Sequence, residues 1–307
     1  MYDLIIIGAG PAGVAAGVYA RRKKIKTLLI TKSFGGQSVV SNNIENWIGK
    51  KSISGFELAK SLEEHLKSQE GVDILEEMSV VKVSKINNRF LVETDQGRKF
   101  ETKTVLIASG SRHRKLNIPG EDKFEGKGVV YCSTCDAPLF KNKTVAVIGG
   151  GNSAFEAVID LFPYAQKIYL LIRSDKARAD LTYVDLVEKN SKTEIIFNAE
   201  AREISGNDFV RGLKYEDKLS GQTKELVLEG VFIEIGSDPN SDIAKDLVKT
   251  DERGAIMVDH KTQRTSVEGI WAAGDVVDGL YKQSNISAGD AIKALLNIND
   301  YLTKNHR

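Results

Sequence analysis

The sequence predicts an α/β fold in which one order of strand, glycine-rich turn and helix occurs twice. The apolar run at residues 4–7 is followed by GAGPAG at 8–13, and the apolar run at 145–148 is followed by GGGNSA at 149–154. The chain's two cysteines lie between these copies, in CSTC at residues 132–135. Strands that alternate with helices in this way predict parallel sheets.

The remaining elements follow from apolar periodicity and turn residues. In the first part we expect strands at 3–7, 27–31, 80–83, 89–94 and 104–110, and helices at 11–22 and 55–69. In the second part we expect strands at 143–148 and 167–172, a helix at 153–161, a strand-rich stretch at 194–235, a turn at 236–240 and a helix at 287–301. The strand, helix, strand order of the N-terminus therefore recurs after residue 112.

Each glycine turn meets the structural context that a dinucleotide site requires. Backbone N–H groups and the helix dipole at the start of a helix can hold a pyrophosphate, and glycines allow the close approach. The residues predicted to do this are Gly8, Gly10, Pro11, Ala12 and Gly13 in the first copy, and Gly149, Gly151, Asn152, Ser153 and Ala154 in the second. The sequence therefore predicts two Rossmann-like dinucleotide-binding domains.

Both copies lack the acidic residue that often holds a ribose about 20 positions further on. Thr31 stands 18 residues beyond Gly13, and we assign no ribose contact there. In the second copy the equivalent strand end is Ile172, which removes the feature that favours NADH.

Composition limits the function classes. The 307 residues have 41% hydrophobic and 28% charged content and a formal net charge of +1. This balance argues against nucleic acid or a membrane as partner, and no 18-residue apolar run occurs. Because MYDLIII opens a strand rather than a signal peptide, we expect a cytoplasmic location.

The cysteine pair is interpreted as a redox pair. In a reducing compartment an isolated CxxC is seldom a structural disulfide. A structural zinc needs four ligands, and the four histidines, His65, His113, His260 and His306, show no HxxxH spacing. We therefore predict no metal site. A CxxC at the start of a helix favours a lowered thiol pKa, and only a thiolate attacks a disulfide.

The succession of motifs resembles the low-molecular-weight thioredoxin reductases. The resemblance covers essentially the whole chain and rests on GAGPAG, GGQ (35–37), IENWIG (44–49), ASG (108–110), CSTCD, GGGNSA, AAGDV (272–276), YKQS (281–284) and SAG (287–289). Within that group, CDAPLFKNK and KYEDKLSG (214–221) are similar to the C-terminal portion of the flavoprotein component of alkyl hydroperoxide reductase.

The resemblance implies a nicotinamide domain inserted into a split FAD domain. The limits we expect are residues 1–114 and 241–307 for the FAD-binding domain and 115–240 for the NAD(P)H-binding domain that carries the CxxC. The inserted domain would pivot on linkers near 112–117 and 236–243, so that nicotinamide and dithiol reach the flavin in turn. A homodimer is also expected from the family.

The resemblance also implies further cofactor contacts. Gly35, Gly36, Gln37, Asn46, Ala108, Gly110, Gly274, Asp275, Lys282, Gln283 and Ser284 are expected to border FAD. NADPH-type relatives hold the 2′-phosphate with an HRRxxxR cluster, of which Arg173 and Arg178 remain here, with Ser174 as a further donor. Asp175 would oppose the phosphate if it pointed inward. NADPH is favoured and NADH stays open, as does the alternative that the two arginines only solvate a helix start.

The roles within the dithiol also follow from the resemblance. Cys135 is expected to lie against the flavin, Cys132 to attack the protein substrate, and Asp136 to carry the proton. The alternative for Asp136 is a helix cap. The usual glycine after the aspartate is Ala137 here. Lys127, Lys141 and Lys143, with Leu139 and Phe140, could form a docking patch for an acidic redox protein or a solvated face over apolar core residues.

The predicted function is an FAD-dependent disulfide reductase that passes electrons from NAD(P)H through FAD and the dithiol to thioredoxin or a thioredoxin-like protein. Two alternatives stay open. Ferredoxin could be the donor, which the intact GGGNSA argues against, or the chain could be a flavin-dithiol redox sensor without turnover.

Overall fold

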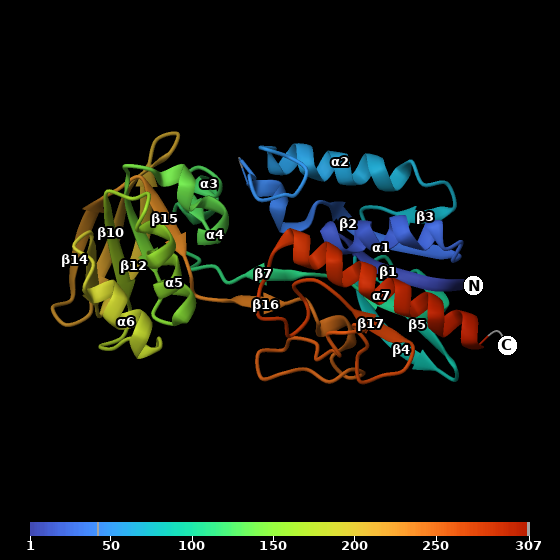
Figure 1. The fold of residues 1–307 in the computed structure, drawn as a ribbon. Coiled ribbons are helices and arrows are strands. Elements are labelled where there is room, and N and C mark those ends of the chain that lie inside the picture. Colours follow the sequence, from blue (N-terminus) through green and yellow to red (C-terminus); the bar gives the residue numbers. More distant parts are fainter. Residues whose placement is uncertain (42, 306–307) are drawn as a thin grey trace. The chain divides into compact units, whose positions relative to one another are not determined.

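The computed structural model of the chain describes residues 1–41 and 43–305 and contains two compact units. The first unit comprises residues 1–42, 47–112 and 238–307, and the second comprises 43–46 and 113–237. Figure 1 shows the chain coloured along its sequence, with many of its elements labelled.

The first unit contains a seven-stranded sheet in the order β3-β2-β1-β6-β5-β4, with β17 paired to β6. Its strands are β1 (Tyr2–Ala9), β2 (Thr27–Phe34), β3 (Val72–Leu75), β4 (Val80–Ile86), β5 (Arg89–Thr94), β6 (Lys99–Ile107) and β17 (Ile270–Ala272). β1 is parallel to both β2 and β6, while β4, β5 and β6 are antiparallel. The central strands are therefore buried and end together at the first glycine turn.

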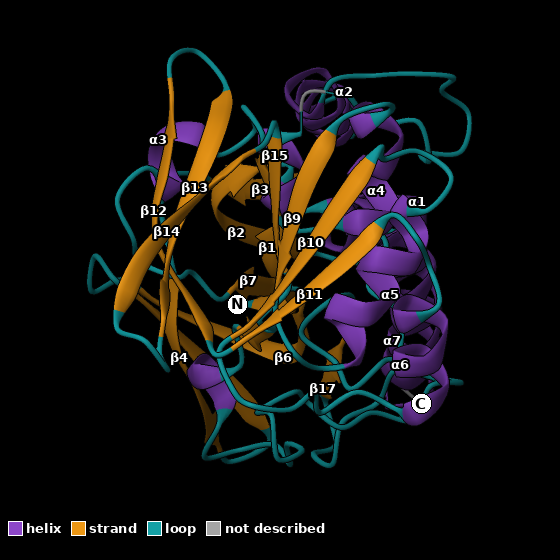
Figure 2. Ribbon diagram, turned by 90° about the vertical axis from the view of Figure 1, so that its left-hand side faces the viewer, coloured by secondary structure: helices purple, strands orange, loops and turns teal. Residues whose placement is uncertain are grey.

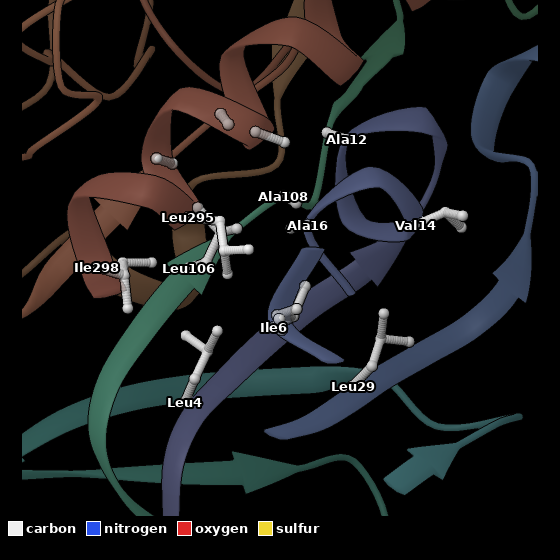
Figure 3. Packing of buried hydrophobic residues seen from close by; sticks show 14 of the residues in the cluster. Leu4, Ile6, Ala12, Val14, Ala16, Leu29, Leu106, Ala108, Leu295 and Ile298 are labelled. Carbon is white, nitrogen blue, oxygen red and sulfur yellow. The ribbon is translucent and has the colours of Figure 1, made fainter. Parts of the chain in front are cut away.

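Helices of the first unit are α1 (Pro11–Arg22), α2 (Gly55–Lys67) and α7 (Ser284–Asn305), with the short 3₁₀ segments η1 (Gly36–Val40) and η3 (Asp242–Ala244). Figure 3 shows Leu4, Ile6 and Leu106 of the sheet packed with Leu295 and Ile298 of α7. The same buried cluster includes Ala12, Val14 and Ala16 of α1. Small side chains on α1 let α7 pack closely against it, so the last helix of the chain supports the first glycine turn.

The two linkers pair with each other. β7 (Ser111–His113) and β16 (Ser237–Pro239) form a two-stranded sheet. The turn expected at residues 236–240 was therefore wrong over 237–239, because the chain there runs extended and pairs with the other linker.

The second unit contains a parallel five-stranded sheet in the order β11-β10-β9-β15-β8 and an antiparallel sheet β12-β13-β14. Its strands are β8 (Val129–Val130), β9 (Thr144–Ile148), β10 (Lys167–Ile172), β11 (Thr193–Phe197), β12 (Ala199–Gly206), β13 (Val210–Asp217), β14 (Gln222–Val227) and β15 (Gly230–Ile233). Its helices are α3 (Glu121–Phe124), α4 (Ser133–Asp136), α5 (Asn152–Leu161) and α6 (Leu181–Glu188), with the 3₁₀ segment η2 (Ala137–Phe140).

Figure 2 shows α5 and α6 on one side of the five-stranded sheet and the three-stranded sheet on the other. Two buried clusters match these layers. Phe155 and Val158 of α5 pack with Val147 and Leu170 on one face, and Leu213 of β13 packs with residues of the other face. Both faces of the parallel sheet are covered, which explains the continuous apolar character of β9 and β15.

Most elements lie where the sequence predicted them. The expected helix at 287–301 begins earlier and ends later, at Ser284–Asn305, because YKQS leads directly into it. The expected strand at 104–110 is Lys99–Ile107, so ASG lies in the turn that follows the strand.

Candidate active site

The first glycine turn is a tight connection between β1 and α1. Gly8 has φ of +104°, and a Cβ built at Gly13 would lie 1.8 Å from the carbonyl oxygen of Gly8. Gly10 is the N-cap of α1, Pro11 begins the helix, and the cap has no side-chain hydrogen bond from the described residues. The first turn of the helix carries no acidic residue. Its N–H groups are therefore available to an anion.

Three motifs that are distant in sequence meet at this turn. A Cβ at Gly274 would lie 3.2 Å from the Cβ of Ala12, and a Cβ at Gly10 would lie 3.9 Å from the Cα of Gly36. Ala108 donates its N–H to Ile7 O at 2.9 Å. GAGPAG, GGQ, ASG and AAGDV thus form one site.

The GGQ segment is tied to the linker and to α7. Gln37 Nε2 donates to the backbone oxygen of Ser111 and also contacts Ser111 Oγ at 3.2 Å. Ser38 Oγ lies 3.2 Å from Ser284 Oγ. Ser111 was not singled out from the sequence, since a lone serine in a linker carries no motif.

A cavity of about 300 Å³ opens beside AAGDV. It is lined by residues that include Gly274, Asp275, Lys282 and Ser287. Ser287 Oγ donates to Asp275 Oδ1 at 3.2 Å, and Lys282 Nζ donates to the backbone oxygens of Asp275 and Val277. Burial lowers the pKa of Lys282, while Asp275 and Asp278 act in the opposite direction.

The other expected FAD contacts lie as follows. Gly35 has φ of +89° and caps η1, and Gly110 has φ of +67° in the turn before β7. Gln283 directly precedes α7, and its backbone oxygen accepts the N–H of Ser287 at 2.9 Å. Asn46 is assigned to the second unit, and its contact with FAD stays a prediction. Thr31 donates its hydroxyl to Ser33 O at 2.6 Å, so that hydroxyl already has a partner.

The second glycine turn repeats the geometry of the first. Gly149 follows β9, and Gly151 is the N-cap of α5, again without a side-chain hydrogen bond from the described part of the chain. The first turn of the helix begins at Asn152, includes Ser153 and Ala154, and has no acidic residue. A Cβ at Gly151 would meet nothing within 4 Å among the described residues. This turn can also accept a phosphate.

The arginine-bearing loop after β10 is fixed to this turn. Arg178 N donates to Gly150 O at 2.7 Å. Asn152 Nδ2 donates to Asp180 Oδ2 at 2.9 Å and Asp180 N donates to Asn152 Oδ1 at 2.8 Å. Arg173 and Arg178 are exposed, as is Asp175. Ser174 Oγ donates to Lys176 O at 2.8 Å, so the predicted phosphate donor already has an acceptor within the loop.

The cysteines form a disulfide between Cys132 and Cys135, with Cα atoms 5.4 Å apart. Cys132 is the N-cap of α4, and Asp136 N donates to Cys132 O at 3.0 Å. Ser133 Oγ donates to Asp160 Oδ2 at 2.9 Å, and Thr134 Oγ1 does so at 3.3 Å. The turn that carries the sulfurs is therefore held on α5.

Asp136 is buried beside the disulfide, with 7% exposure. Burial raises its pKa to about 7. It makes no side-chain cap hydrogen bond to η2, so the helix-cap alternative has no support in the described structure. A carboxyl group that titrates near neutral pH can both give and take a proton.

The docking patch expected from the sequence is only partly present. Phe140 is 4% exposed and packs edge to face on Phe232, with Lys143 Nζ 5.4 Å from its ring centroid. Phe140 is a core residue and cannot contact a partner. Leu139 is exposed at 38%.

Neither a membrane span nor a metal cluster occurs among the described residues. Within 1–41 and 43–305, no helix is long and apolar enough to cross a bilayer. In the same ranges, no three His, Cys, Asp or Glu side chains are grouped to hold a metal ion.

Comparison with known proteins agrees with this geometry. Residues 2–291 match the family described as pyridine nucleotide-disulphide oxidoreductase. Thioredoxin reductase from Streptococcus pyogenes superposes with a TM-score of 0.92 at 36% identity, over 99% of both chains. Thioredoxin reductase from Giardia duodenalis gives a TM-score of 0.91 at 32% identity, over 98% of this chain and 99% of the other.

Curated relatives are longer than this chain. The F subunit of alkyl hydroperoxide reductase of Staphylococcus aureus is 40% identical over 304 residues, which are 99% of this chain and 60% of that protein. A Bacillus subtilis protein named NADH dehydrogenase is 39% identical over 304 residues, 99% of this chain and 59% of its own length. The chain thus spans about 60% of the curated relatives it matches.

Family membership implies FAD and a pyridine nucleotide as cofactors, and the two glycine turns with uncapped helix starts fit them. From the domain match, the fold, the two glycine turns and the disulfide, the chain belongs to the pyridine nucleotide-disulphide oxidoreductases and, within them, to the low-molecular-weight thioredoxin reductase family.

Proposed function

We propose that this protein is a thioredoxin-disulfide reductase that takes electrons from NADPH. The observation that carries the proposal is the Cys132–Cys135 disulfide with Asp136 buried next to it. A dithiol of this spacing exchanges with disulfides of other proteins through its thiolate. A buried acid whose pKa lies near 7 supplies the proton.

The cofactors would lie at the two glycine turns. The β1–α1 turn, with Gly36, Gly274 and the cavity beside Asp275, would hold FAD, and the β9–α5 turn would hold the nucleotide. When bound, the flavin supplies two-electron transfer between nucleotide and disulfide. The paired linkers β7 and β16 are the segment about which the second unit would have to rotate in such a cycle.

The chain's own residues would perform the thiol chemistry. Cys132 attacks the partner's disulfide as a thiolate, which gives a mixed disulfide. Cys135 then attacks Cys132, so the internal disulfide forms again and the partner leaves with both electrons. Asp136, whose pKa burial raises to about 7, gives a proton to the departing sulfur.

NADPH is proposed over NADH because the strand end at Ile172 offers no carboxylate to a ribose, whereas Arg173 and Arg178 lie beside the turn. Because one relative is named NADH dehydrogenase, NADH remains the alternative electron donor. A thioredoxin-like protein is proposed as an alternative partner to thioredoxin. We also expect a homodimer in the cytoplasm.

An anaerobic titration tests the proposal. Purified FAD-loaded protein is titrated with NADPH, NADH and reduced ferredoxin while flavin absorbance is followed, and steady turnover is then measured with thioredoxin. We expect NADPH to bleach the flavin and to sustain thioredoxin reduction. Consumption that stops after one equivalent would show a redox sensor, and bleaching by ferredoxin alone would show a different donor.

A further inference from the structure

The two residues between the cysteines are held by one carboxylate oxygen of a neighbouring helix. Ser133 Oγ donates to Asp160 Oδ2 at 2.9 Å, and Thr134 Oγ1 donates to the same oxygen at 3.3 Å. Ser133 is buried, whereas Thr134 is exposed. The carboxylate therefore joins α5 to both the covered and the solvent-facing residue of the dithiol turn.

Asp160 does not stabilise the helix that carries it. It lies in the last turn of α5, where the carbonyl ends of the helix bear partial negative charge and oppose a carboxylate. That turn contains no basic residue to offset the repulsion. In the part of the chain that the structure describes, the donors to its side chain are the two hydroxyls of the dithiol turn. The contact with the turn is therefore the favourable interaction of this side chain.

The dithiol turn depends on contacts from outside, because α4 is a single helical turn. It spans Ser133–Asp136, and one backbone bond of 3.0 Å from Asp136 N to Cys132 O closes it. A helix of this length is not stable alone in water. By contrast, α5 is fixed, since Phe155 and Leu161 are fully buried in the cluster between this helix and the five-stranded sheet. Asp160 thus connects a turn that is unstable alone to a helix anchored in the core.

Reduction removes the covalent link that otherwise keeps this turn closed. The Cα atoms of Cys132 and Cys135 lie 5.4 Å apart, a separation that a disulfide can bridge. Once two electrons and two protons have converted the disulfide into two thiols, non-covalent contacts alone hold the cysteines at this separation. The bonds to Asp160 do not involve sulfur, so they can form in both redox states. Groups that are held close together react at a high effective concentration.

We propose that Asp160 is a positioning residue for the dithiol, which holds the two hydroxyls of the turn and so keeps the reduced cysteines close enough to form their disulfide again. The inference rests on the proposed function, in which Cys135 displaces the partner from Cys132. In that step the Cys135 thiolate bonds to Cys132 Sγ, and the bond between Cys132 and the partner breaks. The partner sulfur leaves as a thiolate and takes up a proton.

An equilibrium with glutathione measures this closure. In FAD-loaded protein without oxygen, the two thiols and one oxidised glutathione give the disulfide and two reduced glutathiones, and mass analysis after alkylation counts both protein forms. We expect Asp160→Ala to lower the equilibrium constant for disulfide formation about tenfold, which makes the reduction potential about 30 mV less negative. Glu156→Ala, at an exposed carboxylate one turn earlier on α5, is the matched control and should leave the constant unchanged.

Removing the donors instead of the acceptor gives a second test. Ser133→Ala combined with Thr134→Val should lower the constant by the same factor as Asp160→Ala. Adding Asp160→Ala to that protein should lower it no further, because both changes break the same hydrogen bonds. Asp160→Asn keeps an oxygen that can accept the hydroxyls and should recover most of the loss.

An unchanged constant in Asp160→Ala, or a further fall in the combined variant, would overturn the proposal. A purely structural role would lower the melting temperature without moving the constant. If Asp160→Ala does not fold, an unchanged constant in the protein without the two hydroxyls would overturn the proposal by itself. The measurement needs neither NADPH nor thioredoxin. Lack of turnover would therefore refute the proposed function alone, and unchanged constants in an active enzyme would refute the role of Asp160 alone.

Discussion

The hydroxyl of Tyr131 donates a hydrogen bond of 2.9 Å to the buried carboxylate of Glu121. Tyr131 directly precedes Cys132, and its ring stacks on His113 of β7 with centroids 5.0 Å apart. Glu121 also accepts the backbone N–H groups of Leu116 at 3.1 Å and Asn117 at 2.7 Å. One buried carboxylate thus joins the segment after the first linker to the segment that carries the dithiol.

Glu121→Ala should destabilise the second unit strongly, because it leaves two backbone N–H groups and one hydroxyl without their acceptor. We expect a loss of about 2 to 4 kcal/mol, because an unsatisfied buried group such as the Tyr131 hydroxyl costs about 1 to 3 kcal/mol, whereas the two N–H groups are only partly buried and can bond to water. Tyr131→Phe is the matched control: it removes a single donor and should cost only about 1 kcal/mol. Thermal unfolding followed by circular dichroism measures both. A Glu121→Ala loss no larger than that of Tyr131→Phe would contradict this account.

Gly13→Ala should abolish FAD binding, because the new Cβ would overlap the carbonyl oxygen of Gly8 at 1.8 Å and force the β1–α1 turn open. Gly17→Ala is the control in the same helix: its Cβ would meet only the movable end of Leu66, at 2.6 Å. The control should bind FAD with reduced stability. Flavin absorbance per chain after reconstitution is the readout, and a yellow Gly13→Ala protein would show that the turn does not hold the cofactor.

Cys132→Ser should leave flavin reduction by the nucleotide intact and abolish turnover with a disulfide partner. The Cys135 thiolate would then remain beside the flavin, and a long-wavelength charge-transfer band should appear in the absorption spectrum. Cys135→Ser is the counterpart variant. If the band appears in that protein instead, the roles of the two sulfurs are reversed.

Turnover with thioredoxin should fall as pH rises through about 7, because Asp136 must be protonated to act as an acid and burial raises its pKa to about 7. The free energy of unfolding should also fall over this pH range. The carboxyl group binds its proton more tightly in the folded state than in the unfolded state. The stabilisation that this proton gives is therefore complete below the unfolded pKa, near 3.9, and is lost as pH rises through about 7. Asp136→Asn should flatten both profiles over this range, as measured by kcat/KM and by melting temperature. A profile that Asp136→Asn leaves unchanged would assign the proton to another group.

Arg173→Ala should remove most of a preference for NADPH of roughly ten to a hundredfold, because each charged hydrogen bond lost costs about 1.5 to 3 kcal/mol. The apparent KM for NADPH should rise and that for NADH should hardly change. Arg178→Ala, on the same loop, measures how much the second arginine contributes to that preference. Equal losses for both nucleotides would mean that Arg173 does not contact the 2′-phosphate.

Local signals in the sequence determined the two strand–turn–helix units, the uncapped helix starts and the CxxC pair. Gly13 could be predicted without a structure because its close contact, the carbonyl oxygen of Gly8, is nearby in the chain, whereas Gly8 also packs against the backbone of Ala108. The redox interpretation of the cysteines rested on their number and spacing alone, and the disulfide between Cys132 and Cys135 agrees with it.

Only the tertiary structure decided what surrounds these motifs. The pairing of β16 with β7 overturned the expected turn, since strand pairing depends on a partner more than a hundred residues away. Asp160 and Glu121 carry no motif, and they contact the residues around the dithiol because α5 and α3 bring their carboxyl groups there. Burial then raises the pKa of Asp136, and burial is a property of the packed molecule that no local stretch of sequence encodes.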